Sequence, residues 1–426
     1  MGVPQPWAAA ALETTAPALF AQNARDCPDR PALTDFSGTA TRTWTWAQAH
    51  EEATRLAAGL ADLGLQRGQT ALLMMGNSAE HWLADAAATR LGAVPGSVRR
   101  NHSSAEALFL ARHSRARVVV VDGADQVWRW SPALREQTAL AHVVVVDPGA
   151  VPAGDPRFLS WEELRRRGDR RLRAEPDLVE RHRRAITPDQ PATVLYTGIG
   201  AADQKCVVLT HRNLAYTAAA LHQVTGIPRH AATICGRAPL HLAERMTGIY
   251  AALHNAAHVH LHPDPARAVA ALPRIRPPAF LGTPQLWAEL ADRIDGVPDP
   301  QRLRARLGLD RAIWAACGST PVAPAVLDRF ASVDVTIRQC WGTAETTGFA
   351  TADHAGAGRP GTAGQVLPGV EVRIADDGEV LVRGPIVCAG HLQPDGLVKP
   401  VTDADGWLRT GDVGALDDDG FLVIRG

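Results

Sequence analysis

This sequence has no excess of either charge. Its 426 residues include 44 Lys and Arg against 45 Asp and Glu, which gives a formal charge of −1. Such a balance creates no overall field that would attract nucleic acid or an anionic lipid surface. A small-molecule substrate is therefore expected. The length exceeds that of a single hydrophobic core, so we also expect two or three packed subdomains.

Long apolar runs and closely spaced cysteines are absent too. No run approaches the roughly 20 apolar residues of a membrane-spanning helix, and the N-terminus lacks the basic and apolar regions of a secretory signal. The six cysteines are scattered, without CxxC or another metal-ligand spacing. These absences predict a cytoplasmic protein with reduced thiols.

One stretch, residues 165–184, is rich in arginine and reads RRRGDRRLRAEPDLVERHRR. A basic docking patch is one interpretation. The interleaved Asp and Glu favour the other, a solvated helical connection.

The order of helical and strand patterns predicts an α/β fold. Residues 45–68 place Ala49, Ala53, Leu56 and Leu60 on one helical face and end at glycines. The runs RVVVVD (117–122) and HVVVVD (142–147) lack polar alternation, as strands buried on both faces of a parallel sheet do. From about residue 360, short alternating strands with Gly and Asp turns predict a small antiparallel, barrel-like unit.

Residues 196–211, YTGIGAADQKCVVLTH, have the form of a phosphate-binding loop. A strand-like run enters a glycine turn whose backbone N–H groups can face one anion, and Lys205 adds a positive charge. The spacing is not the Walker pattern, because no Gly-Lys-Ser/Thr follows. Taken alone, the stretch also fits an ordinary glycine turn before a strand.

Two segments further along the chain supply groups that bind nucleotides. CWGTAETTG (340–348) offers Trp341 for stacking, the hydroxyl of Thr343, and the Glu345 carboxylate, which can hold Mg²⁺ against phosphate. In the turn TGD, Asp412 can accept hydrogen bonds from two ribose hydroxyls.

The order of these motifs resembles the adenylate-forming superfamily of acyl-CoA ligases, nonribosomal peptide adenylation domains and luciferases. The resemblance covers almost the whole chain. SVRRNHSSAEAL and HLAERMTGIYAAL are most similar to long-chain acyl-CoA ligases. The other stretches that carry it are TWAQAHEEATRLAAGLADLGLQRGQTALLMMGNSAEHW, LGAVPGSV, VLYTGIGAADQKCVVLTHRNL, APLHLAER, FLGTPQLWAEL, AACGSTPVAP, WGTAETT, GEVLVRGP and GWLRTGDVG.

The resemblance implies an N-terminal domain of stacked α/β/α/β/α layers. Residues 1–185 would form one α/β subdomain, 186–359 a second that carries the phosphate loop, and 360–426 a barrel-like subdomain that ends at a hinge. The implied reaction joins ATP and a carboxylic acid into an acyl-adenylate and pyrophosphate. The acyl group then passes to coenzyme A or a carrier thiol.

The resemblance also implies the residues that bind phosphate and Mg²⁺. Lys205 and Thr197 would face the phosphates, within a loop that includes Gly198 and Gly200. Thr343 and Glu345 would contact the α-phosphate and Mg²⁺, and Thr197 would be the second metal ligand.

Further positions correspond to the adenosine and acyl sites of the family. Trp341 and Gly342 would pack against adenine, Ser319 and Thr320 would line the adenine and acyl pockets, and Asp412 would bind the ribose. His241 matches a position at the mouth of the acyl site. A satisfied interior histidine is an equally open interpretation of His241.

The phosphate loop departs from the family pattern in its composition. The family carries several Ser and Thr hydroxyls there, whereas residues 198–204 read GIGAADQ, and no hydroxyl occurs between Gly198 and Thr210. Asp203 adds a negative charge near a polyanion. At about 4 Å from a phosphate oxygen, that charge costs roughly 4 kcal/mol at an effective dielectric near 20.

The second departure is the end of the chain at Gly426. The family continues with a hinge arginine and a mobile C-terminal domain of roughly a hundred residues. That domain carries a lysine that stabilises the reacting phosphorus, and it later rotates to form the thiol-transfer site. A trimmed chain and a natural single-domain protein completed by a partner chain both fit this end. In either case we expect slow adenylation by this polypeptide alone.

Two alternatives to an acid ligase stay open at this point. One is a diazotase-like enzyme that uses ATP and nitrite, for which Arg99 and Arg100 would bind the small anion. The other is a catalytically silent scaffold that binds a nucleotide or an acyl group. The altered loop favours the scaffold, whereas Lys205, Glu345 and Asp412 favour an enzyme.

We predict weaker ATP binding than a loop of the usual composition provides. The charge of Asp203 alone is comparable to about a thousandfold in affinity. Calorimetry with Mg-ATP measures this affinity, and tight, Mg²⁺-dependent binding would contradict the prediction.

Overall fold

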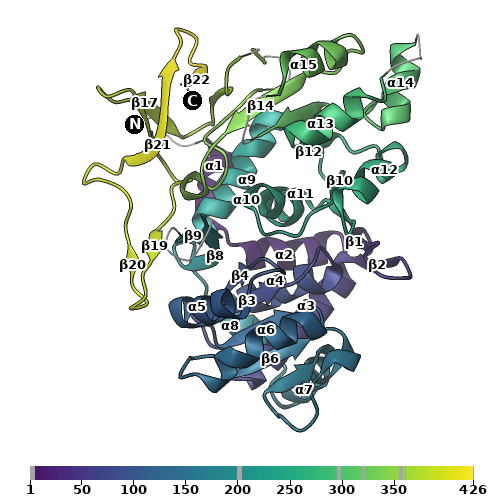
Figure 1. Cartoon of the computed structure of the whole chain (residues 1–426), viewed down its shortest axis with the longest axis vertical. Helices are drawn as coiled ribbons and strands as arrows, with labels where there is room; N and C mark the ends of the chain where they lie inside the picture. The colour runs from purple at the N-terminus through teal and green to yellow at the C-terminus, as the bar shows by residue number, and fades with distance from the viewer. Residues whose placement is uncertain are drawn as a thin grey trace.

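The computed structural model describes residues 5–198, 204–294, 299–318, 322–354, 358–359 and 361–425. Its strands form a nine-stranded sheet, a four-stranded and a five-stranded sheet that lie next to each other, and a separate four-stranded antiparallel sheet. Figure 1 shows the nine-stranded sheet with its helices in the lower half, the second α/β layer above it, and the C-terminal strands in yellow to one side. This arrangement confirms the predicted fold class.

The nine-stranded sheet has the order β20-β19-β9-β8-β4-β3-β5-β6-β7. Val118 and Val120 of β5 pack into one hydrophobic cluster, whereas Val119 and Val121 pack into another. The sheet is therefore buried on both faces, as the unbroken valine run predicts. Its strands are β3 (Thr70–Met74), β4 (Val94–Ser97), β5 (Val118–Val121), β6 (His142–Val145), β7 (Phe158–Ser160), β8 (Pro191–Thr197), β9 (Lys205–Thr210), β19 (Gly390–Leu392) and β20 (Val398–Lys399).

The second layer combines the sheet β10-β11-β1-β2 with the sheet β12-β13-β14-β15-β16. Their strands are β1 (Pro31–Asp35), β2 (Arg42–Thr45), β10 (Ala232–Cys235), β11 (His258–Leu261), β12 (Ala279–Gly282), β13 (Trp314–Cys317), β14 (Ile337–Trp341), β15 (Thr351–Ala352) and β16 (Gln365–Val366). The small antiparallel sheet consists of β17 (Glu371–Ile374), β18 (Glu379–Arg383), β21 (Leu408–Leu416) and β22 (Leu422–Arg425).

Helices lie between and outside these sheets. They are α1 (Pro6–Glu13), α2 (Ala16–Asp26), α3 (Trp46–Asp62), α4 (Ala79–Arg90), α5 (Ser104–Ser114), α6 (Ala124–Arg135), α7 (Trp161–Ala174), α8 (Leu178–Arg184), α9 (His211–Thr225), α10 (Leu242–Arg245), α11 (Ala251–Asn255), α12 (Pro265–Ile275), α13 (Pro284–Ala291), α14 (Pro300–Leu307) and α15 (Pro324–Ala331), with short helical turns η1 (Pro148–Ala150), η2 (Met246–Tyr250) and η3 (Ala344–Thr346). Across the described ranges, no helix combines the length and apolarity needed to cross a bilayer.

The sheets recruit strands from distant parts of the sequence. β8 and β9 lie beyond residue 185 yet belong to the nine-stranded sheet, whereas β1 and β2 lie in the second layer. The hairpin β19–β20 also leaves the C-terminal region and pairs with β9. The predicted boundaries at 185 and 359 therefore divide the sequence and do not separate one sheet from another.

Helix α3 forms where the sequence predicts an amphipathic helix. It begins with a capping box, because the Thr45 hydroxyl accepts from the Gln48 N–H and the Gln48 side chain accepts from the Thr45 N–H. The predicted apolar face is buried, and Gly64 follows the helix with a φ of +80°.

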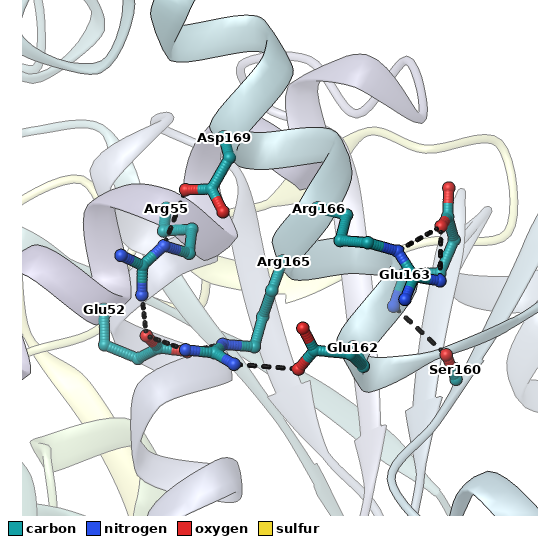
Figure 2. Close-up of polar contacts among 8 residues, drawn as sticks. All are labelled: Glu52, Arg55, Ser160, Glu162, Glu163, Arg165, Arg166 and Asp169. Atoms are coloured by element: carbon teal, nitrogen blue, oxygen red, sulfur yellow. Dashed lines mark hydrogen bonds and ion pairs between the residues drawn. The ribbon is translucent and has the colours of Figure 1, made fainter.

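The arginine-rich stretch lies on α7 and α8, and most of its arginines form ion pairs within the chain. Arg165 Nε lies 2.7 Å from Glu52 of α3, and Arg55 of α3 lies 2.8 Å from Asp169 of α7 (Figure 2). Arg166 pairs with Glu163 one turn earlier on α7. These pairs support the interpretation as a helical connection over that of a docking patch.

Two glycines allow α3 and α7 to pack closely. A Cβ added at Gly168 would lie 1.9 Å from the carbonyl oxygen of Arg55, and one at Gly59 would lie 2.3 Å from that of Leu164. These backbone atoms cannot move aside as a flexible side chain can. The ion pairs that link α3 and α7 therefore depend on the absence of side chains at Gly59 and Gly168.

We expect Gly168→Ala to lower the free energy of unfolding by about 1–3 kcal/mol. The helix preference of alanine, about 1 kcal/mol, acts in the opposite direction and does not remove the overlap. Gly38→Ala is the control, because a Cβ there meets nothing nearer than the Ala40 oxygen at 3.8 Å. Urea denaturation of both variants measures the difference, and equal midpoints would contradict this account.

A buried ion pair joins the layer of the nine-stranded sheet to the second layer. Arg245 of α10 and Asp85 of α4 have almost no exposed surface, and their Nη2 and Oδ2 atoms lie 2.5 Å apart. Arg245 also donates to the Ser97 hydroxyl at 2.9 Å and to the Tyr250 hydroxyl at 3.0 Å. Burial raises the pKa of Asp85, and the charge of Arg245 opposes that rise. Ser97 in turn contacts His81 Nε2 at 2.8 Å, so α4, β4 and α10 share one network.

Removing one partner of this pair leaves an uncompensated buried charge. We expect Arg245→Met to cost about 3–5 kcal/mol of stability, and Asp85→Leu a similar amount. The double variant Asp85→Leu/Arg245→Met is expected to lose less than either single variant, because both desolvated charges are gone. Denaturant titration of the four proteins tests this, and additive losses would show that the pair does not couple the layers.

Candidate functional site

A cavity of about 520 Å³ lies where strands from both layers end. Its lining includes residues at or just beyond the carboxyl ends of β4, β8, β10, β12, β13 and β14. In open α/β sheets, ligands bind at this edge. Of the predicted site residues, the cavity is lined by Thr197, Gly198, His241, Gly342 and Thr343.

Thr343 places an unsatisfied hydroxyl at this cavity. The residue lies between β14 and η3, where its backbone N–H donates to the Thr346 hydroxyl at 2.8 Å. Its own Oγ1 is buried and has no hydrogen-bond partner within the part of the chain that the structure describes. A buried unpaired hydroxyl costs about 1–3 kcal/mol, so a ligand oxygen in the cavity would recover that loss.

Gly342 is required by the backbone next to Thr343. A Cβ at Gly342 would lie 2.6 Å from the backbone nitrogen of Phe349. Any side chain there would push apart the two segments that form this wall. The sequence WGT therefore fixes the position of the Thr343 hydroxyl.

Glu345 does not line the cavity, and it interacts with a residue of the β19 strand. His391 Nε2 lies 2.9 Å from Glu345 Oε1, and the backbone N–H of Cys388 donates to the Glu345 carbonyl. Burial raises the pKa of the Cys388 thiol to about 12, and the Glu345 charge adds to the rise. The β19–β20 hairpin thus positions the carboxylate that the sequence predicts as a metal ligand.

Trp341 and Asp412, which were predicted separately, are in direct contact. The indole Nε1 of Trp341 donates to Asp412 Oδ2 at 2.8 Å. Trp341 ends β14, and Asp412 lies on β21 of the small antiparallel sheet. The bond fixes the carboxylate relative to the aromatic ring, as a site for a ribose next to a base requires.

The phosphate loop is described at its two ends. Thr197 and Lys205 are paired residues of the antiparallel strands β8 and β9, and Gly198 has a φ of +95°. The Lys205 side chain is exposed at the start of β9. The predicted residues Gly200, Ser319 and Thr320, together with Asp203, lie outside the described residues.

His241 is exposed and lines the cavity just before α10. The interpretation as an interior histidine is therefore wrong. Arg245, four residues further on, anchors this segment through its buried ion pair.

Sequence reasoning missed several residues of the lining. Ser97 and Thr247 line the cavity, and so do Arg237 and Glu244, whose charged groups lie 4.0 Å apart. Glu244 Oε2 is buried without a partner in the described ranges. Ser97, Glu244 and Thr247 lie within stretches that carry the resemblance, but nothing in those stretches assigns them to the site, because only the fold brings β4, α10 and η2 together.

The arginines proposed for a nitrite site do not act together. Arg99 lines the cavity, whereas Arg100 Nε lies 2.7 Å from Asp122. The charge of Arg100 is thus already neutralised.

The predicted metal ligands are oxygen donors that suit a metal ion held partly by the protein and partly by a bound nucleotide. Within the described ranges, no group of three His, Cys, Asp or Glu side chains is placed to hold a metal ion. Mg²⁺ in nucleotide sites commonly uses one or two carboxylates together with substrate phosphates and water. Glu345 and Thr197 fit this kind of site and would not form a protein-only metal centre.

The sequence matches the profile of the family described as AMP-binding enzyme over residues 20–392. Among curated relatives, fadD11 of Mycobacterium tuberculosis is named as a fatty-acid–CoA ligase and is 32% identical over 57% of this chain and 50% of its own length. The long-chain-fatty-acid–CoA ligase ACSBG2 of Xenopus laevis is 25% identical over 96% of this chain and 62% of its own length. The chain therefore spans about half to two thirds of these relatives.

Solved structures share the fold. The inhibitor-bound N-terminal domain of FACL13 from Mycobacterium tuberculosis aligns with a TM-score of 0.77 at 21% identity, over 97% of this chain and 99% of that domain. The anthranilate CoA ligase AuaEII, solved with anthranoyl-AMP, aligns with the same TM-score at 19% identity, over 97% of this chain and 77% of that one. With the profile match over most of its length, the chain belongs to the family of AMP-binding enzymes.

Proposed function

We propose that this chain activates a carboxylic acid with ATP, as the large domain of an AMP-forming acid ligase. A carboxylate oxygen would form a bond to the α-phosphorus, and the bond from that phosphorus to the pyrophosphate leaving group would break. The observation that carries the proposal is the buried hydroxyl of Thr343, which has no partner among the described residues, at a cavity that Thr197 and Gly198 also line. That hydroxyl would donate to an oxygen of the α-phosphate.

The other predicted residues have roles that follow from their positions. Asp412, held by the Trp341 indole, would accept hydrogen bonds from the ribose hydroxyls while the ring packs on adenine. Lys205 would supply positive charge to the phosphates, and His241 would lie at the entrance for the acid. Glu345, positioned by His391, would hold Mg²⁺, which neutralises phosphate charge when bound.

The names of the relatives support a fatty acid as the substrate class. fadD11 and ACSBG2 are both named for fatty-acid–CoA ligation. Transfer of the acyl group to coenzyme A or a carrier thiol, a cytoplasmic location, and completion of the site by a separate C-terminal domain belong to the same proposal.

The Thr343 hydroxyl can be tested by ligand binding alone, because binding needs no turnover. We expect Thr343→Val to weaken binding of an acyl-sulfamoyl-adenosine, a stable mimic of the acyl-adenylate, by about tenfold in calorimetry. Thr54→Val is the matched control, since the Thr54 hydroxyl donates to the His50 carbonyl within α3, outside the cavity lining. Equal affinity of both variants would remove Thr343 from the binding site.

The reaction is tested by ATP–pyrophosphate exchange with fatty acids, aryl acids and nitrite. Exchange that depends on an organic acid supports the ligase. Exchange with nitrite, or binding of AMP without any exchange even when a separate C-terminal domain of the family is added, would contradict it in favour of a diazotase or of a silent scaffold.

A further inference from the structure

A second, smaller cavity adjoins the first. Its volume is about 90 Å³, and it shares Ile234, Thr247, Leu281 and Phe349 with the larger cavity. Most of its remaining lining is apolar, contributed by α9, α11, β10 and the start of β12. The second cavity is therefore an apolar space next to the one that Thr343 lines.

Two polar atoms interrupt this apolar lining. Asn255, at the end of α11, is 5% exposed, and its Oδ1 has no hydrogen-bond partner in the described ranges. The same holds for Nδ1 of His222 on α9. Both residues line the second cavity and not the first. They therefore mark the part of the second cavity that is remote from the phosphate residues.

Three other polar side chains of this lining are already satisfied. The Thr225 hydroxyl donates to the Leu221 carbonyl at 2.8 Å, and the Thr247 hydroxyl donates to the Ala243 carbonyl at 2.9 Å. The Trp314 indole donates to the Asp353 carbonyl at 3.1 Å. Asn255 and His222 thus stand apart as groups that a ligand can satisfy.

We infer that the acid activated here carries a hydroxyl group at the end remote from its carboxylate, and that Asn255 and His222 recognise that hydroxyl. This inference rests on the proposed acid-activating function. The expected substrates are therefore acids with a terminal hydroxyl group, in preference to acids with an unsubstituted hydrocarbon chain.

A hydroxyl suits these partners better than other polar groups. It donates its one hydrogen to the Asn255 oxygen and accepts from His222 Nδ1 in the tautomer that carries the proton on that nitrogen. A charged end group would lose its hydration in an apolar space. The neighbouring His254 ring, 5.3 Å from that of His222, has its pKa lowered to about 4 by burial and by His222, so the surroundings disfavour charge. The volume also suits a short polar end, since one water takes about 30 Å³.

The test compares two acyl-sulfamoyl-adenosines of equal chain length, one with a terminal hydroxyl and one without. We expect the hydroxylated compound to bind about tenfold more tightly in calorimetry, because the unsubstituted one leaves Asn255 unpaired. Asn255→Leu is expected to reverse this preference. Thr225→Val is the matched control. Thr225 lines the same cavity and its hydroxyl already donates within α9, so this variant is expected to keep the preference ratio of the unmodified protein.

A second variant, His222→Leu, guards against a folding effect of the Asn255 substitution and is expected to reduce the preference as well. Equal binding of the two compounds, each tighter than AMP, would overturn the hydroxyl inference alone and leave acid activation standing. Binding of neither compound more tightly than AMP would overturn both the inference and the proposed function.

Discussion

The ion pair between Arg245 and Asp85 is the interaction on which the cavity depends. Two desolvated charges cost several kcal/mol each, and only close mutual contact with further hydrogen bonds offsets that cost. Arg245 meets this condition with Asp85, Ser97 and Tyr250. Because these partners come from α4, β4 and η2, one guanidinium fixes the place where the two layers meet.

The position of Arg245 also determines where several residues of the cavity lining lie. Arg245 ends the short helix α10, whose preceding loop carries His241 and whose first turn carries Glu244, and both line the cavity. Ser97, bound by Arg245, lines it from the opposite layer. The buried pair therefore influences the site by position, because it holds the segment that carries His241 against the carboxyl end of β4.

The sequence predicts local structure well where one element determines its own pattern. The apolar face of α3 and the buried valine strand β5 follow from the spacing of their own residues. The contacts of Asp412 with Trp341 and of His391 with Glu345 span 71 and 46 residues. The first joins two sheets, and the second joins β19 to η3. Nothing in either motif indicates its partner, since a carboxylate in a turn has many possible donors.

Contacts between distant parts of the chain also explain why the sequence does not predict which strands share a sheet, or the second cavity. Strand pairing selects neighbours by shape and burial across the whole chain, so β8 and β9 join the nine-stranded sheet although they follow residue 185. Asn255 and His222 carry no motif, and they matter because the fold buries one atom of each without a partner among the residues that the structure describes. Unsatisfied polar atoms become visible only after the packing is known.

These unsatisfied atoms also indicate where the proposed reaction obtains its binding energy. The sequence of the phosphate loop has no side-chain hydroxyl between Gly198 and Thr210, whereas Thr343 at the first cavity and Asn255 at the second each have a buried atom with no partner in the part of the chain that the structure describes. Each such group is worth about 1 kcal/mol or more when a ligand satisfies it. In the proposed reaction, binding energy would thus come less from the leaving pyrophosphate than from the acyl and adenosine parts, which the acyl-adenylate retains. Such a site would be better matched to the acyl-adenylate than to ATP, and this relation would favour formation of the acyl-adenylate over simple retention of the nucleotide.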